Sequence, residues 1–110
     1  MYLEYLNVNL TNDSDGVLQD IHWYEGIFGY FPTYALGAMM SSQIKYNCPH
    51  YKVFLEKPGV DNLKNIANWL NKNIHQKASL YSSDEMLQNI SGENLNPIYY
   101  LKHLRERFIK

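Results

Sequence analysis

The feature that most constrains the fold is an apolar repeat with a spacing of three and four residues in the second half of the chain. Between residues 61 and 75 the repeat places its apolar side chains on one face of a helix: Leu63, Ile66, Leu70 and Ile74. No segment of comparable length alternates apolar and polar residues with the period of two that a half-buried strand requires. The sequence therefore predicts an all-α fold.

Residues 2–6 have the pattern of the last turns of an amphipathic helix. After them, capping residues and helix breakers divide the chain into about five to six helices. Ser82 and Glu85 have the spacing of a capping box, and Pro49 and Pro97 suit the first turn of a helix. The expected helices cover residues 16–24, 32–46, 49–55, 61–75, 83–90 and 97–108. We expect them to form a compact array, and we take residues 1–110 as a single helical segment.

Two more of these helices have an apolar face, and that of the last helix is predicted to be buried. In the helix that begins near Pro32, apolar residues recur at helical spacing: Leu36, Met39, Met40 and Ile44. In the last helix the corresponding stripe is formed by Tyr100, Leu101, Leu104 and Phe108. Gly37 and Ser41 are small and lie one turn apart, so a neighbouring helix could approach closely on that side.

Charge and composition exclude several classes of function. The chain has 110 residues and a net charge of −1, from 10 basic and 11 acidic residues, so it lacks the basic surface expected of a nucleic-acid or anionic-membrane protein. No apolar run approaches the roughly 18 residues of a membrane helix, and the N-terminus does not resemble a signal peptide. A single cysteine, Cys48, cannot form an internal disulfide. We therefore expect a cytoplasmic protein.

Residues 16–37 have the composition of a pocket wall. Rigid aromatic side chains alternate there with groups that donate and accept protons, in two ordered motifs. The motifs are Gly16-x-x-Gln19-Asp20-x-His22-Trp23 and Phe28-Gly-Tyr30-Phe-Pro-Thr-Tyr34-x-Leu-Gly37. The alternative interpretation is a tyrosine-rich helix junction inside a core.

The histidines do not have the spacing of a metal site. A metallopeptidase helix usually carries the motif His-Glu-x-x-His, and this motif is absent. The chain's histidines are far apart in the sequence: His22, His50, His75 and His103. Asp20 and His22 are two residues apart, and on one helix they would point in different directions. We therefore expect no metal ligand set in this chain.

The two ordered motifs resemble the last signature region of the carboxypeptidase Taq family, which are zinc metallocarboxypeptidases that remove C-terminal residues from peptides. Three further segments match the family: Asn12-Asp-x-x-Gly-Val-Leu-Gln-Asp20, Trp69-Leu-x-x-Asn73-Ile-His75 and Ser91-Gly-Glu-x-Leu-Asn-Pro97-x-Tyr-Tyr. Family members are several times longer, and the likeness falls on their C-terminal end. The resemblance implies a helical segment of a larger metallopeptidase, whose zinc is bound elsewhere.

The resemblance also implies roles for side chains in the two motifs. Tyr30 is the expected main hydrogen-bond donor to the oxyanion that forms during peptide hydrolysis, and Tyr34 is the second choice. His22 is the expected donor to the substrate or the transition state. Asp20 would orient His22 or cap a helix, and Gln19 would bind substrate or backbone. In the alternative interpretation both tyrosines are core aromatics with satisfied hydroxyl groups.

Three functional hypotheses follow. In the first, the chain is the C-terminal segment of a metallocarboxypeptidase, either a truncated piece of it or the product of a split gene whose other product carries the metal helix, and is inactive alone. In the second, it is a non-catalytic remnant that binds a partner or peptide. The third, an independent enzyme that uses Asp20 and His22 as a dyad, has no nucleophile at a suitable spacing to support it. In the first two cases helices that lack their neighbours expose apolar surface, so we expect self-association into a homo-oligomer, or marginal stability of the isolated chain.

Overall fold

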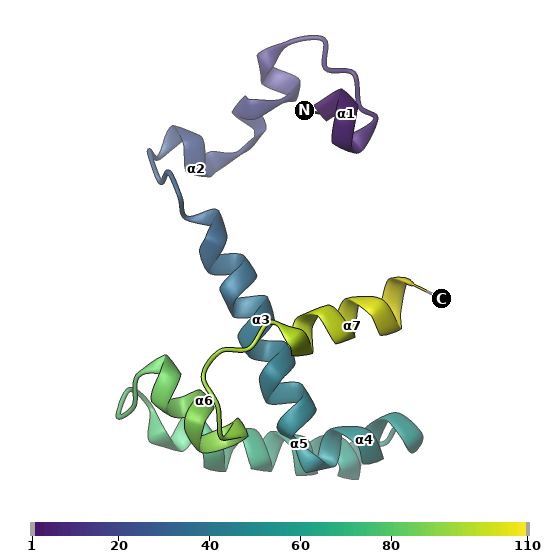
Figure 1. Cartoon of the computed structure of the whole chain (residues 1–110), viewed down its shortest axis with the longest axis vertical. Coiled ribbons are helices and arrows are strands. Elements are labelled where there is room, and N and C mark those ends of the chain that lie inside the picture. Colours follow the sequence, from purple (N-terminus) through teal and green to yellow (C-terminus); the bar gives the residue numbers. More distant parts are fainter. Residues whose placement is uncertain (1, 110) are drawn as a thin grey trace. The chain divides into compact units, whose positions relative to one another are not determined.

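A computed structural model describes residues 2–109, apart from the side chain of Tyr24, and these residues confirm the all-α class (Figure 1). They form seven α-helices and three short 3-10 helices, with no strand in the described range. The α-helices are α1 (Tyr2–Leu6), α2 (Ile21–Tyr24), α3 (Phe31–Asn47), α4 (Pro49–Glu56), α5 (Val60–Asn73), α6 (Ser83–Ser91) and α7 (Ile98–Phe108). The 3-10 helices are η1 (Asp13–Asp15), η2 (Val17–Gln19) and η3 (His75–Lys77). No helix of the described range is long and apolar enough to cross a membrane.

The chain divides into two compact units, residues 1–34 and residues 35–110. The boundary falls inside α3, so no loop or change of composition marks it in the sequence. The first unit contains the two aromatic motifs up to Tyr34. The second contains the amphipathic helices and most of α3.

The first unit is built from short helices that local side chains terminate. Asn12 caps η1, because its side-chain oxygen accepts a hydrogen bond from the backbone N–H of Asp15. The single helix expected over residues 16–24 is wrong, since the chain is extended at Asp20 (φ −103°, ψ 117°) between η2 and α2. The Asp20 carboxylate accepts from the backbone N–H of His22 and so starts a new helix there.

The connection from α2 to α3 requires glycine at two positions. Gly26 and Gly29 have positive φ angles of 66° and 80°, which side chains with a Cβ atom disfavour. Helix α3 then begins at Phe31, with Pro32 in its first turn as predicted. The hydroxyl and backbone N–H of Thr33 both donate to the carbonyl oxygen of Tyr30. These bonds fix Tyr30 at the start of α3.

In the second unit the predicted start and stop signals are confirmed. Ser82 and Glu85 form a complete capping box at the start of α6, and Gly92 ends that helix in the left-handed conformation. Helix α7 is an exception, because it begins at Ile98, one residue later than expected, with Pro97 as its N-cap; the Asn96 side chain accepts from the backbone N–H of Ile98. Helices α4 and α5 pack against each other.

The fully buried part of α3 is polar, although Met39, Met40 and Ile44 of its predicted apolar face are half-buried. The residues of α3 that are buried are Ser42 and Gln43, while Leu36 is 46% exposed. The Gln43 side chain donates to the Ser91 hydroxyl and the Asn94 carbonyl oxygen, and accepts from the backbone N–H of Asn96. It therefore supplies hydrogen-bond partners to the loop between α6 and α7, which has no regular structure to satisfy its backbone groups.

Few hydrophobic side chains are fully buried in the described part of the chain. Only Cys48 and Leu87 fall in that class. The α5 stripe is partly covered at Ile66, Leu70 and Ile74 but not at Leu63, which is 54% exposed. The predicted stripe of α7 is wrong at Leu101 and Phe108, which are 46% and 69% exposed. The helices thus present apolar surface that this chain does not cover.

Candidate functional site

The imidazole of His22 lies at the centre of a small polar cluster in the first unit. Asp20 precedes α2, and one oxygen of its carboxylate, Oδ1, accepts from the backbone N–H of His22 at 2.8 Å. The same oxygen lies 2.6 Å from Nδ1 of the His22 ring. The expectation that the two side chains point in different directions is wrong, because Asp20 lies outside the helix that carries His22.

The backbone of His22 keeps Asp20 ionised. The hydrogen bond from the His22 N–H is the main reason that the pKa of the Asp20 carboxyl is lowered, and the contact with the ring lowers this pKa further. A carboxylate can only accept, so the Nδ1 atom of His22 carries the proton in this contact. In a neutral ring, the other nitrogen Nε2 is then an acceptor. Asp20 therefore sets both the orientation and the tautomer of His22.

The Tyr34 hydroxyl lies on the other side of the ring, 3.1 Å from Nε2 of His22. With a neutral imidazole the hydroxyl donates its proton to Nε2. With a protonated imidazole, Nε2–H donates to the hydroxyl oxygen, and the tyrosine proton is free to point elsewhere. Asp20, His22 and Tyr34 thus form one continuous chain of hydrogen bonds.

Tyr30 stacks on the same imidazole. The rings of His22 and Tyr30 have centroids 5.2 Å apart and planes inclined by 24°, and the Tyr30 ring meets the Tyr34 ring edge-on at 5.4 Å. Among the side chains that the structure describes, the Tyr30 hydroxyl has no hydrogen-bond partner. It is the free donor of the cluster.

Aromatic side chains hold the cluster in place while one face remains open. Phe31 packs against His22, with ring centroids 4.9 Å apart, and Trp23 packs against Phe31, with ring centroids 6.5 Å apart. The His22 side chain is 18% exposed, whereas Tyr30 and Tyr34 are 43% and 56% exposed. The two hydroxyl-bearing rings are therefore accessible to a ligand in this unit.

Gln19 is not brought into the cluster. Its side-chain amide donates to the carbonyl oxygen of Ser14 within the turn that precedes α2. Gln19 lies at the end of η2, and the extended Asp20 separates it from His22. In this geometry Gln19 stabilises the local backbone, and its expected contact with substrate stays a prediction.

The described residues do not provide a metal site. Residues 2–109 contain no group of three or more His, Cys, Asp or Glu side chains that could hold a metal ion. The Asp20–His22 pair offers two candidate ligands, whereas a zinc site in a hydrolase uses three protein ligands and a water. What the cluster offers instead is hydrogen-bond donors and a tunable imidazole.

One interacting pair was missed by sequence reasoning. Lys45 Nζ lies 3.0 Å from His103 Nδ1, in the second unit. The two residues are 58 positions apart and belong to α3 and α7, so no local spacing reveals the contact.

The chain matches one family of peptidases over nearly all of its length. A family model described as carboxypeptidase Taq (M32) metallopeptidase matches residues 1–108. Thermostable carboxypeptidase 1 of Pyrococcus furiosus is 35% identical over 108 residues, which is 94% of this chain and 21% of that protein. Carboxypeptidase 1 of Bacillus subtilis is 32% identical over 111 residues, which is 97% of this chain and 22% of that protein.

A solved structure has the same fold. The structure reported as "The Structure of CHT" superposes with a TM-score of 0.82 at 38% sequence identity, and the match covers 99% of this chain and 22% of that chain. The chain therefore spans 21–22% of the length of the relatives that it matches here.

Proposed function

This chain belongs to the carboxypeptidase Taq (M32) metallopeptidase family, and from that premise we propose that it is the C-terminal part of a zinc metallocarboxypeptidase. In this proposal it supplies donors to the substrate and oxyanion, and it is inactive without a metal-binding portion that lies outside residues 1–110. The single observation that carries the proposal is the open cluster of Asp20, His22, Tyr30 and Tyr34. The family relationship indicates the reaction in which these donors would take part, the hydrolysis of a peptide bond.

The free hydroxyl of Tyr30 is the donor that we assign to the oxyanion. When a peptide carbonyl is attacked, negative charge develops on its oxygen, and a fixed donor stabilises that charge more than the neutral ground state. A tyrosine suits this role because its hydroxyl keeps its proton at neutral pH. The aromatic contacts of Tyr30 hold it in place before the reaction, so little reorganisation is needed.

His22 and Tyr34 act as a second, switchable donor. When the imidazole is protonated, Nε2–H donates to the Tyr34 oxygen. The Tyr34 proton is then directed away from His22 and toward the exposed face, where a substrate carbonyl can accept it. With the neutral imidazole the same proton is held by Nε2. Asp20 is therefore a positioning residue, and Tyr34 is a donor that depends on the state of His22.

The metal itself has to come from elsewhere. Zinc would polarise the carbonyl and activate the attacking water, but the described residues of this chain lack a ligand set for it. Peptide hydrolysis by this chain alone is therefore not expected. The partner that we propose is the part of the family polypeptide that the match does not cover, with a peptide as substrate.

The test is complementation. The chain is mixed with the portion of Bacillus subtilis carboxypeptidase 1 that lies outside the match, and cleavage of a peptide is compared with that of its C-terminally amidated form. We expect zinc-dependent release of the terminal residue from the free peptide only in the mixture. Tight stoichiometric zinc binding or robust cleavage by the isolated chain would overturn the proposal that the metal site lies outside this chain.

The second candidate is a non-catalytic helical module that binds a partner. The observation that favours it is the large number of exposed hydrophobic side chains, among them Leu3, Tyr5, Leu80 and Phe108. The two candidates separate on one result, because a remnant binds the complementary portion or another protein without restoring cleavage. In both, the uncovered surface favours homo-oligomers when the chain is alone, and sedimentation at increasing concentration measures this.

A cytoplasmic location completes the proposal. Cys48 is a free, buried thiol, as is common in a reducing compartment. Fractionation of the source cells with an antibody against the chain tests this. Recovery of the chain in an oxidising compartment would contradict it.

A further inference from the structure

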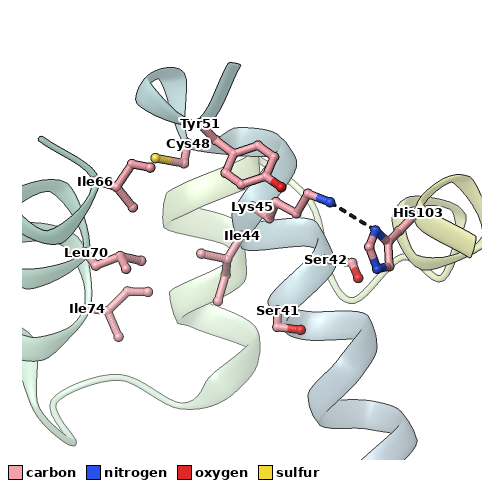
Figure 2. Close-up of a pocket in the computed structure, with 10 residues that line it drawn as sticks. All are labelled: Ser41, Ser42, Ile44, Lys45, Cys48, Tyr51, Ile66, Leu70, Ile74 and His103. Atoms are coloured by element: carbon pink, nitrogen blue, oxygen red, sulfur yellow. Dashed lines mark hydrogen bonds between the residues drawn. The ribbon is translucent and has the colours of Figure 1, made fainter. Parts of the chain in front are cut away.

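The second unit contains an apolar groove that the candidate site does not use. It lies between α3, α4, α5 and α7 and has a volume of about 440 Å³ (Figure 2). Its apolar lining consists of Ile44, Cys48, Tyr51, Ile66, Leu70 and Ile74. In Figure 2, the side chains of Ile66, Leu70 and Ile74 project from one helix toward Ile44 of α3. No Asp or Glu is among the residues that line the groove.

One cation in this groove has no carboxylate partner. Lys45 is half-buried, its Nζ lies 3.0 Å from Nδ1 of His103, and it also lies 4.9 Å from the centre of the Tyr51 ring. Within residues 2–109 no Asp or Glu oxygen lies within 4.0 Å of this ammonium group. An ammonium group has three protons to donate, and His103 accepts one of them. The groove therefore combines an apolar floor with a half-buried positive charge that has no carboxylate beside it in the described residues.

We propose that this groove is the docking site for an apolar segment that bears an aspartate or glutamate. The segment belongs to the part of the family polypeptide that this chain does not cover. Its apolar side chains fill the space between α3 and α5, and its carboxylate accepts from Lys45. Taking a half-buried ammonium group further out of water is unfavourable unless an anion replaces the water. This inference rests on the proposed function for the identity of the partner.

Two observations favour this occupant over a second copy of the chain. The chain spans 21–22% of its relatives, so most of the family polypeptide is available to cover it. The apolar stripe of α5 that lines the groove is only partly covered within the chain, although the separation of apolar and polar residues on opposite faces is stronger in α5 than in α3, α4, α6 or α7. A second copy is an outcome of the test, because it would compete for the same surface.

The experiment measures binding of the same Bacillus subtilis portion by calorimetry, without reference to activity. Lys45→Met keeps the length of the side chain but removes the charge, and we expect affinity to fall about 10- to 100-fold, as for loss of a charged hydrogen bond. Ile66→Lys places a charge in the groove and should abolish measurable binding. The matched controls are Lys64→Met and Leu80→Lys, which make the same changes at exposed positions outside the groove.

Each outcome decides the inference. Equal effects of the groove and control substitutions, or no binding by the unsubstituted chain, would overturn it. Dimerisation of the chain that Ile66→Lys abolishes, with no effect on binding of the portion, would assign the groove to a second copy. A Tyr30→Phe variant is expected to bind normally. Groove-dependent binding without any restored cleavage would leave this inference standing and remove the proposed enzymatic function.

Discussion

Replacing Gln43 by alanine should destabilise the second unit more than any other single polar truncation in it. The Gln43 side chain is fully buried and makes three hydrogen bonds, one to Ser91 at the end of α6 and two to the loop between α6 and α7. Truncation removes all three and leaves two backbone groups without their partner, the carbonyl of Asn94 and the N–H of Asn96. The Ser91 hydroxyl keeps its bond to the carbonyl of Leu87.

The magnitude follows from those two backbone groups. Leaving a buried polar group unsatisfied costs about 1 to 3 kcal/mol. Asn96 is half-buried and bears this cost, whereas Asn94 is exposed and water replaces part of its lost bond. We therefore expect Gln43→Ala to lower the free energy of unfolding by about 2 to 3 kcal/mol. Gln43→Leu should not recover this, because it fills the space without satisfying either group.

The assay is urea unfolding followed by circular dichroism at 222 nm. Gln76→Ala, at an exposed position in η3, is the matched control, and a change within about 0.5 kcal/mol is expected for it. One ordinary hydrogen bond contributes about 1 kcal/mol to stability. If Gln43→Ala lowers the free energy of unfolding by less than this, that result would refute the reasoning. Full stability of Gln43→Leu would do the same, because it would show that packing and not hydrogen bonding sets the role of this residue.

Three further predictions concern titration and capping. Ser82→Ala should lower the free energy of unfolding, measured in urea, by about 1 kcal/mol. The hydrogen bonds from Ser82 lower the pKa of Glu85. The contribution of Glu85 to stability is therefore present above the ordinary pKa of a glutamate and is lost as the pH falls through the lowered value. Burial and the bond to Glu106 raise the pKa of Tyr46 to about 12, so its contribution is present below pH 10 and lost as the pH rises through about 12. The bond to Glu93 also raises the pKa of Tyr99, so absorbance at 295 nm should show a late-titrating component, and Tyr46→Phe should remove the part of it near pH 12. Carbon NMR should find the pKa of the Asp20 carboxyl below its ordinary value. In His22→Ala this pKa should still be lowered, because the largest cause is the hydrogen bond from the backbone N–H of residue 22, which the variant keeps. A return of the Asp20 pKa to its ordinary value in His22→Ala would contradict this.

The helices were predictable because their signals are local. Capping residues, prolines and glycines act within one turn, so Ser82, Pro49 and Gly92 mark helix ends without reference to the rest of the chain. The break at Asp20 was missed for a related reason. Its side chain competes with the helix for the N–H of His22, and the spacing alone does not reveal which of them prevails.

The packing was less predictable because the partners of each face are distant in sequence. Gln43 is buried since a loop some fifty residues away needs hydrogen bonds. Leu101 and Phe108 lie on an apolar stripe that is exposed in this chain. Periodicity identifies which face of a helix is apolar, but it does not tell what covers that face.

In the candidate site, the sequence identified the residues but not their connections. His22, Tyr30 and Tyr34 were singled out from their chemistry and from the family motif, and they lie together. The order of the hydrogen bonds, with Asp20 on Nδ1 and Tyr34 on Nε2, depends on the extended backbone at Asp20. It was therefore visible only in three dimensions.

The most direct test of the central claim is the turnover number of the complemented enzyme with Tyr30→Phe. Loss of one oxyanion donor should lower kcat about 100-fold or more, with little change in KM. Tyr81→Phe, an exposed tyrosine in the other unit, is the control and should leave kcat unchanged. If Tyr30→Phe and Tyr81→Phe have the same kcat, Tyr30 is not a donor in the reaction, and the account of the cluster is wrong.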